Sequence, residues 1–290
     1  MTDSLERGVA GLQSGKGHGD ENFPVASFLI APKNRAPVMA FYKFVRAADD
    51  VSDNAQAAPD EKLRLLELMR QSLVGENDVV PEGVALRRIM AERGLSPTHA
   101  LDLLEAFRRD CTKLRYQDWD DLIDYCRYSA MPVGRFVLDV HGEDRRLWPA
   151  NDALCAALQV INHLQDCAKD YRELNRVYIP EPLLGQAGVG VEALGQDKAN
   201  PALAGVISSL ARRNAELLEV SRPFAEGIGD GRLSLEVDLI QTLADDLNTM
   251  LINRDPLSQS VHHSKMDVAT LFVKRFPAFA LMRLTRPRAR

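Results

Sequence analysis

Apolar residues recur at spacings of three and four positions along most of the chain. Residues 61–75, 99–115 and 201–220 are clear examples. This spacing is the period of an amphipathic helix, whereas the strict alternation that is typical of strands is rare. The pattern therefore predicts an all-α protein with eight to ten helices.

Start and stop signals divide this pattern into elements. Proline or acidic residues precede apolar-periodic stretches at positions 59–60, 96–97, 118–121 and 151–152, and such residues favour the first turn of a helix. The clearest breaks are residues 75–83, 141–151 and 178–200, of which the last is long enough to form a flap or lid. Because the sequence contains neither a flexible linker nor a repeat, we expect one helical domain over residues 1–290. Residues 1–20 are expected to be poorly ordered and residues 283–290 to form a basic tail.

Composition narrows the class of protein. The 290 residues are 46% hydrophobic and 27% charged, which is typical of a soluble globular chain. The four cysteines are widely spaced without a C-x-x-C pair, which predicts neither a zinc site nor a disulfide framework and suits a reducing compartment. The N-terminus lacks the apolar core of a secretory signal, and no stretch approaches the roughly 18 apolar residues of a membrane span. A cytoplasmic location is expected.

Charge is concentrated at the C-terminus. The chain carries a formal net charge of −5, yet residues 271–290 contain six Lys and Arg and no acid, which leaves −11 on the rest. A basic, Phe-containing tail can contact the anionic inner face of a membrane, and it can equally be a last core helix with a solvated Arg-rich end. The acidic body argues against a nucleic-acid partner.

A stripe of polar side chains lies on the otherwise apolar segment 37–54. The stripe consists of Tyr42, Arg46, Asp49 and Asp53. At 100° per residue they fall within an arc of about 60° on a helix. Charges on a buried helix face need a partner, because their desolvation is costly.

Residues 151–176 repeat this arrangement with Gln159, Asn162, Asp166 and Asp170 in a similarly narrow arc. Two such helices facing one cavity would bring four carboxylates together, and their repulsion calls for a cation. Hard oxygen ligands favour Mg²⁺, which commonly also binds substrate phosphates. The paired stripes predict a magnesium-held diphosphate.

A single D-x-x-x-D pair, by contrast, is more often an exposed helix face. Asp120 and Asp124 form such a pair in the first turns of a predicted helix, where acids interact favourably with the helix dipole. We assign no chemistry to them. The other two pairs differ because Tyr, Arg, Gln and Asn lie in register with them.

Small residues and a proline interrupt a third helical segment, residues 121–142. They are Ser129, Ala130, Pro132 and Gly134. Proline kinks a helix and small residues allow close approach to the backbone. This pattern is typical of a pocket floor for an isoprenoid chain or of a tight helix crossing. The residues alone favour the helix crossing.

Together, these motifs resemble the squalene/phytoene synthase family over about residues 20–260. Tyr42-x-x-x-Arg46-x-x-Asp49-Asp50-x-x-Asp53 is similar to the first aspartate-rich motif of that family, and Gln159-x-x-Asn162-x-x-x-Asp166-x-x-x-Asp170 to the second. Tyr125-Cys126 with Ser129-Ala130 and Val133-Gly134 resembles its YCxxVAGxVG helix, and Arg176-x-Tyr178-x-Pro180 its R-x-Y-x-P loop.

The resemblance implies an all-α, single-domain isoprenoid synthase fold around a central cavity, with an isoprenoid diphosphate as substrate. It implies Mg²⁺ ligands at Asp49, Asp53, Asn162, Asp166 and Asp170, and catalytic roles for Tyr42, Arg46 and Tyr178. The residues that it places against the substrate are Gln159, Arg176, Ser129, Ala130, Val133 and Gly134.

Within the family, residues 21–27, 129–135 and 162–166 look most like the bacterial hydroxysqualene synthase branch of the hopanoid pathway. This implies conversion of presqualene diphosphate and water to hydroxysqualene and pyrophosphate, with other enzymes of that pathway as partners. Head-to-head condensation of two farnesyl diphosphates to presqualene diphosphate or squalene is the alternative. An alternative of another class is a non-catalytic helical protein that binds a prenyl diphosphate.

Two residues depart from the common family pattern. Gln165 stands where many relatives have Arg, which removes a positive charge beside the second carboxylate pair. We expect a substrate with one diphosphate to tolerate that loss better than two farnesyl diphosphates would. Arg135 adds an Arg near the predicted pocket helix.

Overall fold

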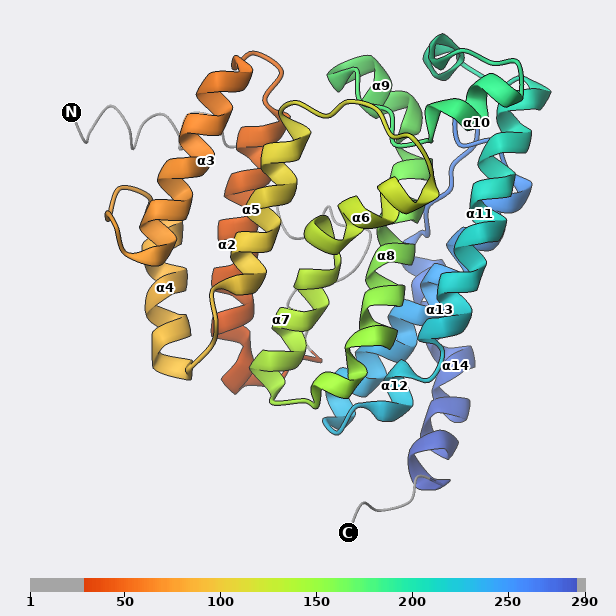
Figure 1. Ribbon diagram of the computed structural model, residues 1–290. Coiled ribbons are helices and arrows are strands. Elements are labelled where there is room, and N and C mark those ends of the chain that lie inside the picture. The colour runs from red at the N-terminus through yellow and green to blue at the C-terminus, as the bar shows by residue number, and fades with distance from the viewer. Residues whose placement is uncertain (1–28, 286–290) are drawn as a thin grey trace.

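A computed structural model describes residues 29–285, and these residues form a bundle of α-helices without any strand (Figure 1). The all-α prediction is confirmed. The long helices are α2 (Pro32–Asp53), α3 (Pro59–Val74), α4 (Pro81–Arg93), α5 (Thr98–Asp110), α6 (Trp119–Ser129), α7 (Met131–His141), α8 (Trp148–Gln165), α11 (Pro201–Ser221), α13 (Gly231–Asn253) and α14 (Lys265–Thr285). The short ones are α9 (Cys167–Leu174), α10 (Glu181–Gln186) and α12 (Phe224–Gly227), with 3₁₀ turns η1 (Arg145–Leu147) and η2 (Val191–Gly195).

Most helix ends follow from local chemistry. Pro59 is the first residue of α3, as its fixed φ and missing amide hydrogen favour. Asp118 caps α6, where its carboxylate accepts a hydrogen bond from the amide of Asp121 at 2.8 Å. Gly75 and Gly142 end α3 and α7 in the left-handed conformation, at φ 89° and 71°. These starts and stops were predicted from the sequence.

The prediction of eight to ten helices was wrong, because residues 29–285 contain thirteen α-helices. The segment 121–142 is two helices that separate at Ala130. Pro132 lacks an amide hydrogen, so it is tolerated in the first turn of α7 and not inside a continuous helix. The break at 178–200, expected to be a flap, contains α10 and η2 and buries Leu184 and Leu194. The expected poor order of residues 1–20 concerns residues outside the described range.

The second polar stripe also differs from the prediction of one helix over 151–176. Its helix α8 begins earlier, at Trp148, and ends at Gln165. Asp166, with φ −96° and ψ 8°, separates α8 from α9. Asp166 and Asp170 therefore lie on different elements, and Arg176 lies in the loop that follows α9.

Two large groups of buried side chains form most of the core. One lies among α6, α8, α11 and α13, and the other among α2, α3, α4 and α5. Helix α8 packs against α11 and α13, while α2 packs against α4, α5 and α7. The rings of Phe41 and Phe136 stack at 4.0 Å between centroids and join α2 to α7. This packing brings the aspartate-bearing ends of α2 and α8 to the same end of the bundle as α9 and the C-terminal end of α5 (Figure 1).

All four cysteines are free thiols, as the spacing predicted. No helix among residues 29–285 is both long and apolar enough to cross a membrane.

Candidate functional site

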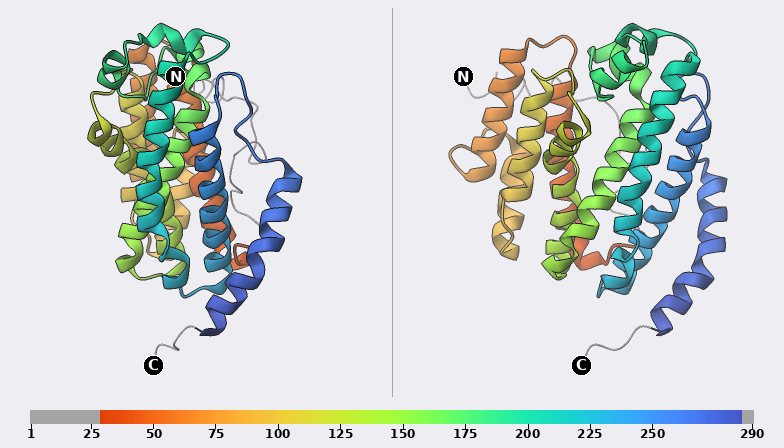
Figure 2. Two further views of the ribbon diagram at one scale, coloured as in Figure 1. Left: turned by 90° about the vertical axis from the view of Figure 1, so that its right-hand side faces the viewer. Right: turned by 45° about the vertical axis from the view of Figure 1, so that its right-hand side comes forward.

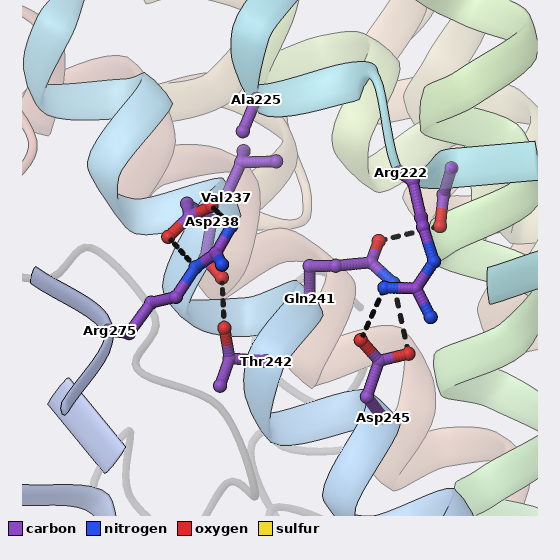
Figure 3. A pocket seen from close by; sticks show the side chains of 9 residues that line it. Arg222, Ala225, Val237, Asp238, Gln241, Thr242, Asp245 and Arg275 are labelled. Atoms are coloured by element: carbon purple, nitrogen blue, oxygen red, sulfur yellow. Dashed lines mark hydrogen bonds and ion pairs between the residues drawn. The ribbon is translucent and has the colours of Figure 1, made fainter. Parts of the chain in front are cut away.

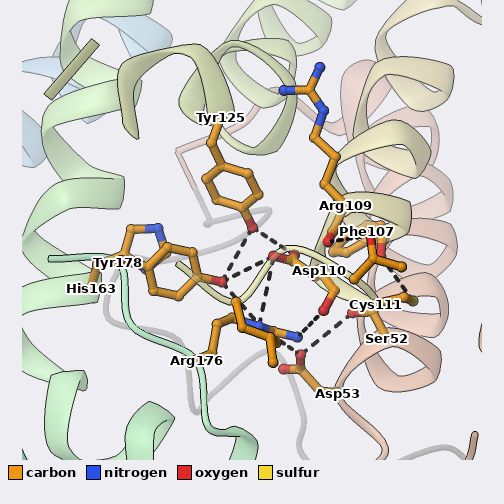
Figure 4. Close-up of polar contacts among 12 residues, drawn as sticks. Ser52, Asp53, Phe107, Arg109, Asp110, Cys111, Tyr125, His163, Arg176 and Tyr178 are labelled. Carbon is orange, nitrogen blue, oxygen red and sulfur yellow. Dashed lines mark hydrogen bonds and ion pairs between the residues drawn. The ribbon is translucent and has the colours of Figure 1, made fainter. Parts of the chain in front are cut away.

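Arg176 joins the ends of two helices that each carry an aspartate (Figure 4). Its Nη1 donates to Asp53 Oδ1 of α2 at 2.9 Å, and its Nη2 donates to the carbonyl oxygen of Asp110, the last residue of α5, at 3.2 Å. The Nε of Arg176 lies 3.8 Å from Asp110 Oδ1. The Arg176 side chain is only 7% exposed, so its charge is held by these acids and not by water. The loop after α9 is thereby fixed between the two halves of the core.

Asp110 also accepts hydrogen bonds from two tyrosine hydroxyls. Tyr125 donates to Oδ2 at 2.7 Å and Tyr178 donates to Oδ1 at 3.2 Å. Tyr178 in turn accepts from Arg176 Nη1 at 3.3 Å. Asp110, Tyr125, Arg176 and Tyr178 therefore form one buried network, and we call it the Asp110 network. Its members hold the Arg176 guanidinium in a single orientation toward Asp53.

The first polar stripe is arranged around Arg46. This arginine donates from Nη1 to Asp49 Oδ2 at 2.7 Å and from Nη2 to Asp50 Oδ1 at 2.8 Å. Tyr42 lies one turn before Arg46 on α2 and is half-buried. The four stripe residues share one helix face, as predicted. Asp50, which the stripe did not include, completes the pairing of Arg46.

The carboxylates of the two stripes interact electrostatically. Desolvation and the charge of Asp53 raise the pKa of Asp49 to about 8, although Arg46 opposes the shift. Desolvation and the charge of Asp166 raise the pKa of Asp170 to about 7, with a further contribution from Asp53. Both shifts result mainly from burial, with a smaller contribution from the neighbouring carboxylates.

A divalent cation would offset the mutual repulsion of these carboxylates. Asp49, Asp53, Asn162, Asp166 and Asp170 offer the hard oxygen donors that Mg²⁺ prefers. Within residues 29–285, however, no three Asp, Glu, His or Cys side chains are grouped closely enough to form a metal site by themselves. Mg²⁺ usually takes only one or two carboxylates and completes its shell with water and substrate phosphates. The donor set therefore fits an ion that binds together with a diphosphate.

Tyr178 is packed against His163 of α8. The two rings stack with their centroids 3.4 Å apart and their planes at 15°. Gln159, one turn earlier on α8, contacts His163 through the two Nε2 atoms at 3.2 Å. Burial, with a smaller contribution from Arg176, lowers the pKa of His163 to about 3. The imidazole is therefore neutral at physiological pH, and it positions Tyr178 through ring stacking.

The buried, neutral His163 predicts a loss of folding stability in acid. Its folded pKa of about 3 lies below its usual 6.5, so between these values only the unfolded chain takes up the proton. Stability should fall as the pH decreases from 6.5, by up to about 1.4 kcal/mol per pH unit. His163→Phe keeps a ring on Tyr178 and removes the titration. Urea unfolding at about pH 7 and about pH 5 should show a smaller acid loss in the variant than in the wild type. Equal losses in the two proteins would contradict the prediction.

Gln165 and Arg135, the two departures from the family pattern, contact residues outside the two polar stripes. Gln165 is 7% exposed and its Nε2 donates to the carbonyl oxygen of Val261. Arg135 pairs with Asp152 and places its guanidinium 4.5 Å from the centre of the Trp148 ring. Gln165 therefore joins α8 to the segment before α14, and Arg135 joins α7 to α8.

The residues of the predicted pocket floor lie at the junction of α6 and α7. Ala130 is buried at the break, whereas Val133 is 39% exposed. The Ser129 hydroxyl is buried and finds no hydrogen-bond partner among residues 29–285. Gly134 faces α8, where a Cβ atom would lie 1.9 Å from Asn151 Oδ1 and 2.8 Å from Cys155 Sγ. For Gly134, this contact favours the helix-crossing alternative.

Gly134→Ala should therefore destabilise the fold. Asn151 is 1% exposed and its amide is bonded to Asp152, so it cannot easily move away from an added methyl group. Overpacking of this kind costs about 1–3 kcal/mol. The matched control is Gly205→Ala in α11, where the added Cβ meets nothing within 4 Å. Alanine there should leave the free energy of unfolding unchanged or raise it by about 0.5–1 kcal/mol. Urea unfolding of both variants is the measurement, and equal values would contradict the crossing.

Sequence reasoning missed Asp110 and assigned no role to Tyr125. Asp110 follows Leu103 and Phe107 at helical spacing, so it continues the buried apolar face of α5. An acid on such a face was the available signal. Asp120 is exposed in the first turn of α6, as predicted. Asp124 forms a surface ion pair with Arg109 at 2.9 Å.

Known proteins match this chain over most of its length. The squalene/phytoene synthase family matches residues 16–267. A hydroxysqualene synthase of Rhodopseudomonas palustris is 58% identical over 87% of this chain and 86% of its own length. A hydroxysqualene synthase of Zymomonas mobilis is 54% identical over 91% and 89% of the two chains.

Solved structures share the fold. The squalene synthase HpnC of Alicyclobacillus acidocaldarius superposes with a TM-score of 0.67 at 26% identity, over 96% of this chain and 95% of its own. A dehydrosqualene synthase superposes with a TM-score of 0.74 at 22% identity, over 96% and 99% of the two chains. The helical bundle is thus the all-α isoprenoid synthase fold, and the named relatives set aside the non-catalytic alternative. This chain is an enzyme that belongs to the squalene/phytoene synthase family.

Proposed function

We propose that this enzyme converts presqualene diphosphate and water to hydroxysqualene and pyrophosphate. The relatives that are 51–58% identical to it are named hydroxysqualene synthases, which supports this reaction over condensation of two farnesyl diphosphates. The observation that carries the proposal in the structure is the position of Arg176. A buried guanidinium sits between Asp53 of the first aspartate-rich segment and Asp110 of α5, and the amide of the same residue donates to the carbonyl oxygen of Asp170 in the second segment at 3.1 Å.

The chain's own residues account for the first step. The C–O bond to the diphosphate breaks, and both electrons leave with the pyrophosphate. Arg46 and Arg176 supply fixed positive charge for that leaving group, and both are oriented before substrate arrives by their acidic partners. Tyr42, one turn before Arg46, and Tyr178, which accepts a hydrogen bond from Arg176, are proposed to orient the pyrophosphate or a water. Gln159 is proposed to contact the substrate from α8.

The remaining steps occur on the hydrocarbon part. The cyclopropylcarbinyl cation rearranges, water adds to it, and the proton of that water leaves. No electrons are gained or lost overall, so the reaction requires no reductant. The Ser129 hydroxyl, buried and without a partner among residues 29–285, supports a substrate contact at the α6–α7 junction, together with Ala130 and Val133.

We propose Mg²⁺ as the cofactor, held by Asp49, Asp53, Asn162, Asp166 and Asp170. When bound, it would supply electrostatic stabilisation of the departing pyrophosphate. Burial, and after it the repulsion of neighbouring carboxylates, raises the pKa values of Asp49 and Asp170 to about 8 and about 7, and the repulsion supports a cation at this place because a positive charge would relieve it.

We infer a cytoplasmic enzyme that contacts the inner face of the membrane through its basic C-terminus. Free thiols at all four cysteines are consistent with a reducing compartment. The largely apolar product is nearly insoluble in water, so release beside a bilayer is favourable. Other enzymes of the same pathway, which supply the substrate and consume the product, would act at that surface.

Product analysis tests the proposed reaction. The purified enzyme with Mg²⁺ is incubated separately with presqualene diphosphate and with farnesyl diphosphate, and the organic extracts are examined by mass spectrometry. Hydroxysqualene from presqualene diphosphate, with little product from farnesyl diphosphate, supports the proposal. Label from ¹⁸O-water in the product hydroxyl identifies the quenching step. Presqualene diphosphate or squalene from farnesyl diphosphate would assign the enzyme to the condensing branch instead.

A further inference from the structure

Helix α14 lies along the outside of α13, and its C-terminal end extends past the bundle (Figure 2). Its inner face is attached to the protein. Arg275 forms two hydrogen bonds with Asp238 of α13, at 2.8 and 2.7 Å, and Phe279 is 7% exposed. Arg283 donates to the carbonyl oxygen of Ile228 at 2.9 Å. These contacts fix which face of α14 points outward.

A cavity of about 260 Å³ lies beneath this attachment (Figure 3). Arg275 and Asp238 form one part of its wall, while Arg222 and Asp245, 3.2 Å apart, form another. Both arginines are paired with an acid, so the cavity offers no free charge to a ligand. The pairing of Arg275 with Asp238 instead anchors α14, since Asp238 is only 5% exposed and needs a cation.

The outer face of α14 is apolar and exposed. Five large side chains on it are between 46% and 83% exposed: Met266, Val273, Phe276, Leu281 and Leu284. At 100° per residue these five fall within an arc of about 140°. We call this set the outer stripe. A contiguous apolar face of this kind on a soluble protein marks a surface that binds something.

Charge on α14 and in the sequence that follows it is mainly positive. Lys274 borders the outer stripe on the helix, and Arg286, Arg288 and Arg290 follow in the sequence. Asp267 is the only acid within α14. Two copies of this chain that paired through their outer stripes would bring like charges together, which is unfavourable. An anionic surface offers both the opposite charge and an apolar interior.

We propose that the outer stripe of α14 docks on an anionic lipid bilayer, with its apolar side chains among the upper acyl chains and its basic residues at the phosphates. The helix lies in the plane of the membrane and stays attached to α13 through Arg275 and Phe279. This deepens the proposed membrane contact by assigning it to a defined face. It does not depend on which diphosphate the enzyme uses.

Vesicle flotation tests the assignment. The full chain is mixed with vesicles of equal parts phosphatidylglycerol and phosphatidylcholine, and with vesicles of phosphatidylcholine alone. The wild type should float with the anionic vesicles and much less with the neutral ones. Val273→Glu with Leu281→Glu should lower the bound fraction at least about tenfold, because two charges then enter the apolar layer.

A matched control replaces an exposed apolar residue on another helix. Val74 at the end of α3 is 38% exposed, and Val74→Glu should leave flotation unchanged. Circular dichroism and turnover in detergent should be the same in both variants as in the wild type, since α14 contributes no residue to the candidate site. Because flotation is measured without substrate, its failure would not bear on the proposed reaction.

Two results would overturn the proposal. One is equal flotation of the wild type and the double variant. The other is self-association of the wild type without vesicles, by analytical ultracentrifugation, that the double variant loses. The second result would show that the outer stripe binds another copy of the chain.

Discussion

Replacing Asp49 or Asp166 by Ala should lower turnover by at least about a hundredfold to a thousandfold, because each removes one oxygen donor and one negative charge from the proposed magnesium-diphosphate site. The two residues lie on different elements, α2 and the α8–α9 break. Similar losses from both would indicate that the two aspartate-rich segments act on one leaving group. Turnover is measured with presqualene diphosphate over a range of Mg²⁺ concentrations. A partial recovery at high Mg²⁺ is expected for each variant.

The control for this experiment is Asp120→Ala. Asp120 belongs to a D-x-x-x-D pair with the same spacing, but it is exposed in the first turn of α6. Turnover and stability should change little, because surface substitutions usually cost less than about 0.5 kcal/mol. If Asp49→Ala and Asp166→Ala were as active as Asp120→Ala, the metal assignment would be wrong.

Asp110→Asn should lower the free energy of unfolding by about 1–3 kcal/mol, because it leaves one buried tyrosine hydroxyl of the Asp110 network without its acceptor. The substitution keeps the shape of the side chain and removes its charge. Burial raises the pKa of Asp110 to about 6, so the measurement belongs at a higher pH, where the carboxylate is ionised. Unfolding in guanidinium chloride gives the free energy of unfolding. Turnover should fall as well, because Tyr125 and Tyr178 both donate to the Asp110 carboxylate and the single side-chain oxygen of Asn leaves one of them without its acceptor.

Asp124→Asn is the matched control for this prediction. It removes an acid paired with an arginine at 2.9 Å, but on the surface, where Asp124 is 44% exposed. Exposed ion pairs contribute about 0–1 kcal/mol, so the change in unfolding free energy should be small. Equal losses from the two substitutions would contradict the argument that burial sets the importance of the Asp110 network.

The fold class and the polar stripes could be predicted because they depend on local periodicity. The stripe of Tyr42, Arg46, Asp49 and Asp53 needs only the geometry of one helix, and α2 provides it. Helix caps such as Asp118 are also local, since donor and acceptor are three residues apart. The expected substrate class and site residues came instead from the resemblance to the squalene/phytoene synthase family. Membership of that family is now confirmed.

The break at Asp166 and the role of Asp110 could not be predicted in this way. Nothing in residues 151–176 forbids a continuous helix, because the segment contains neither Gly nor Pro. Tertiary contacts determine instead that the helix breaks at Asp166. Asp110 acquires its role only through Arg176 and two tyrosines that come from other elements, so its partners are invisible to a periodicity argument. The ligand assignments of the aspartates remain predictions.

The buried position of Arg176 has a consequence for how the chain folds. Its two acidic partners lie 66 and 123 positions away in the sequence, so the contacts close two very long loops. Closing long loops costs chain entropy, and contacts of high sequence separation tend to form late. The helices of each half can assemble from near neighbours, but the charge site exists only once the halves have joined. A partly folded chain would therefore lack the arginine at the site, and amide hydrogen exchange around residues 176–178 should report the completion of folding more closely than exchange within α3 or α11.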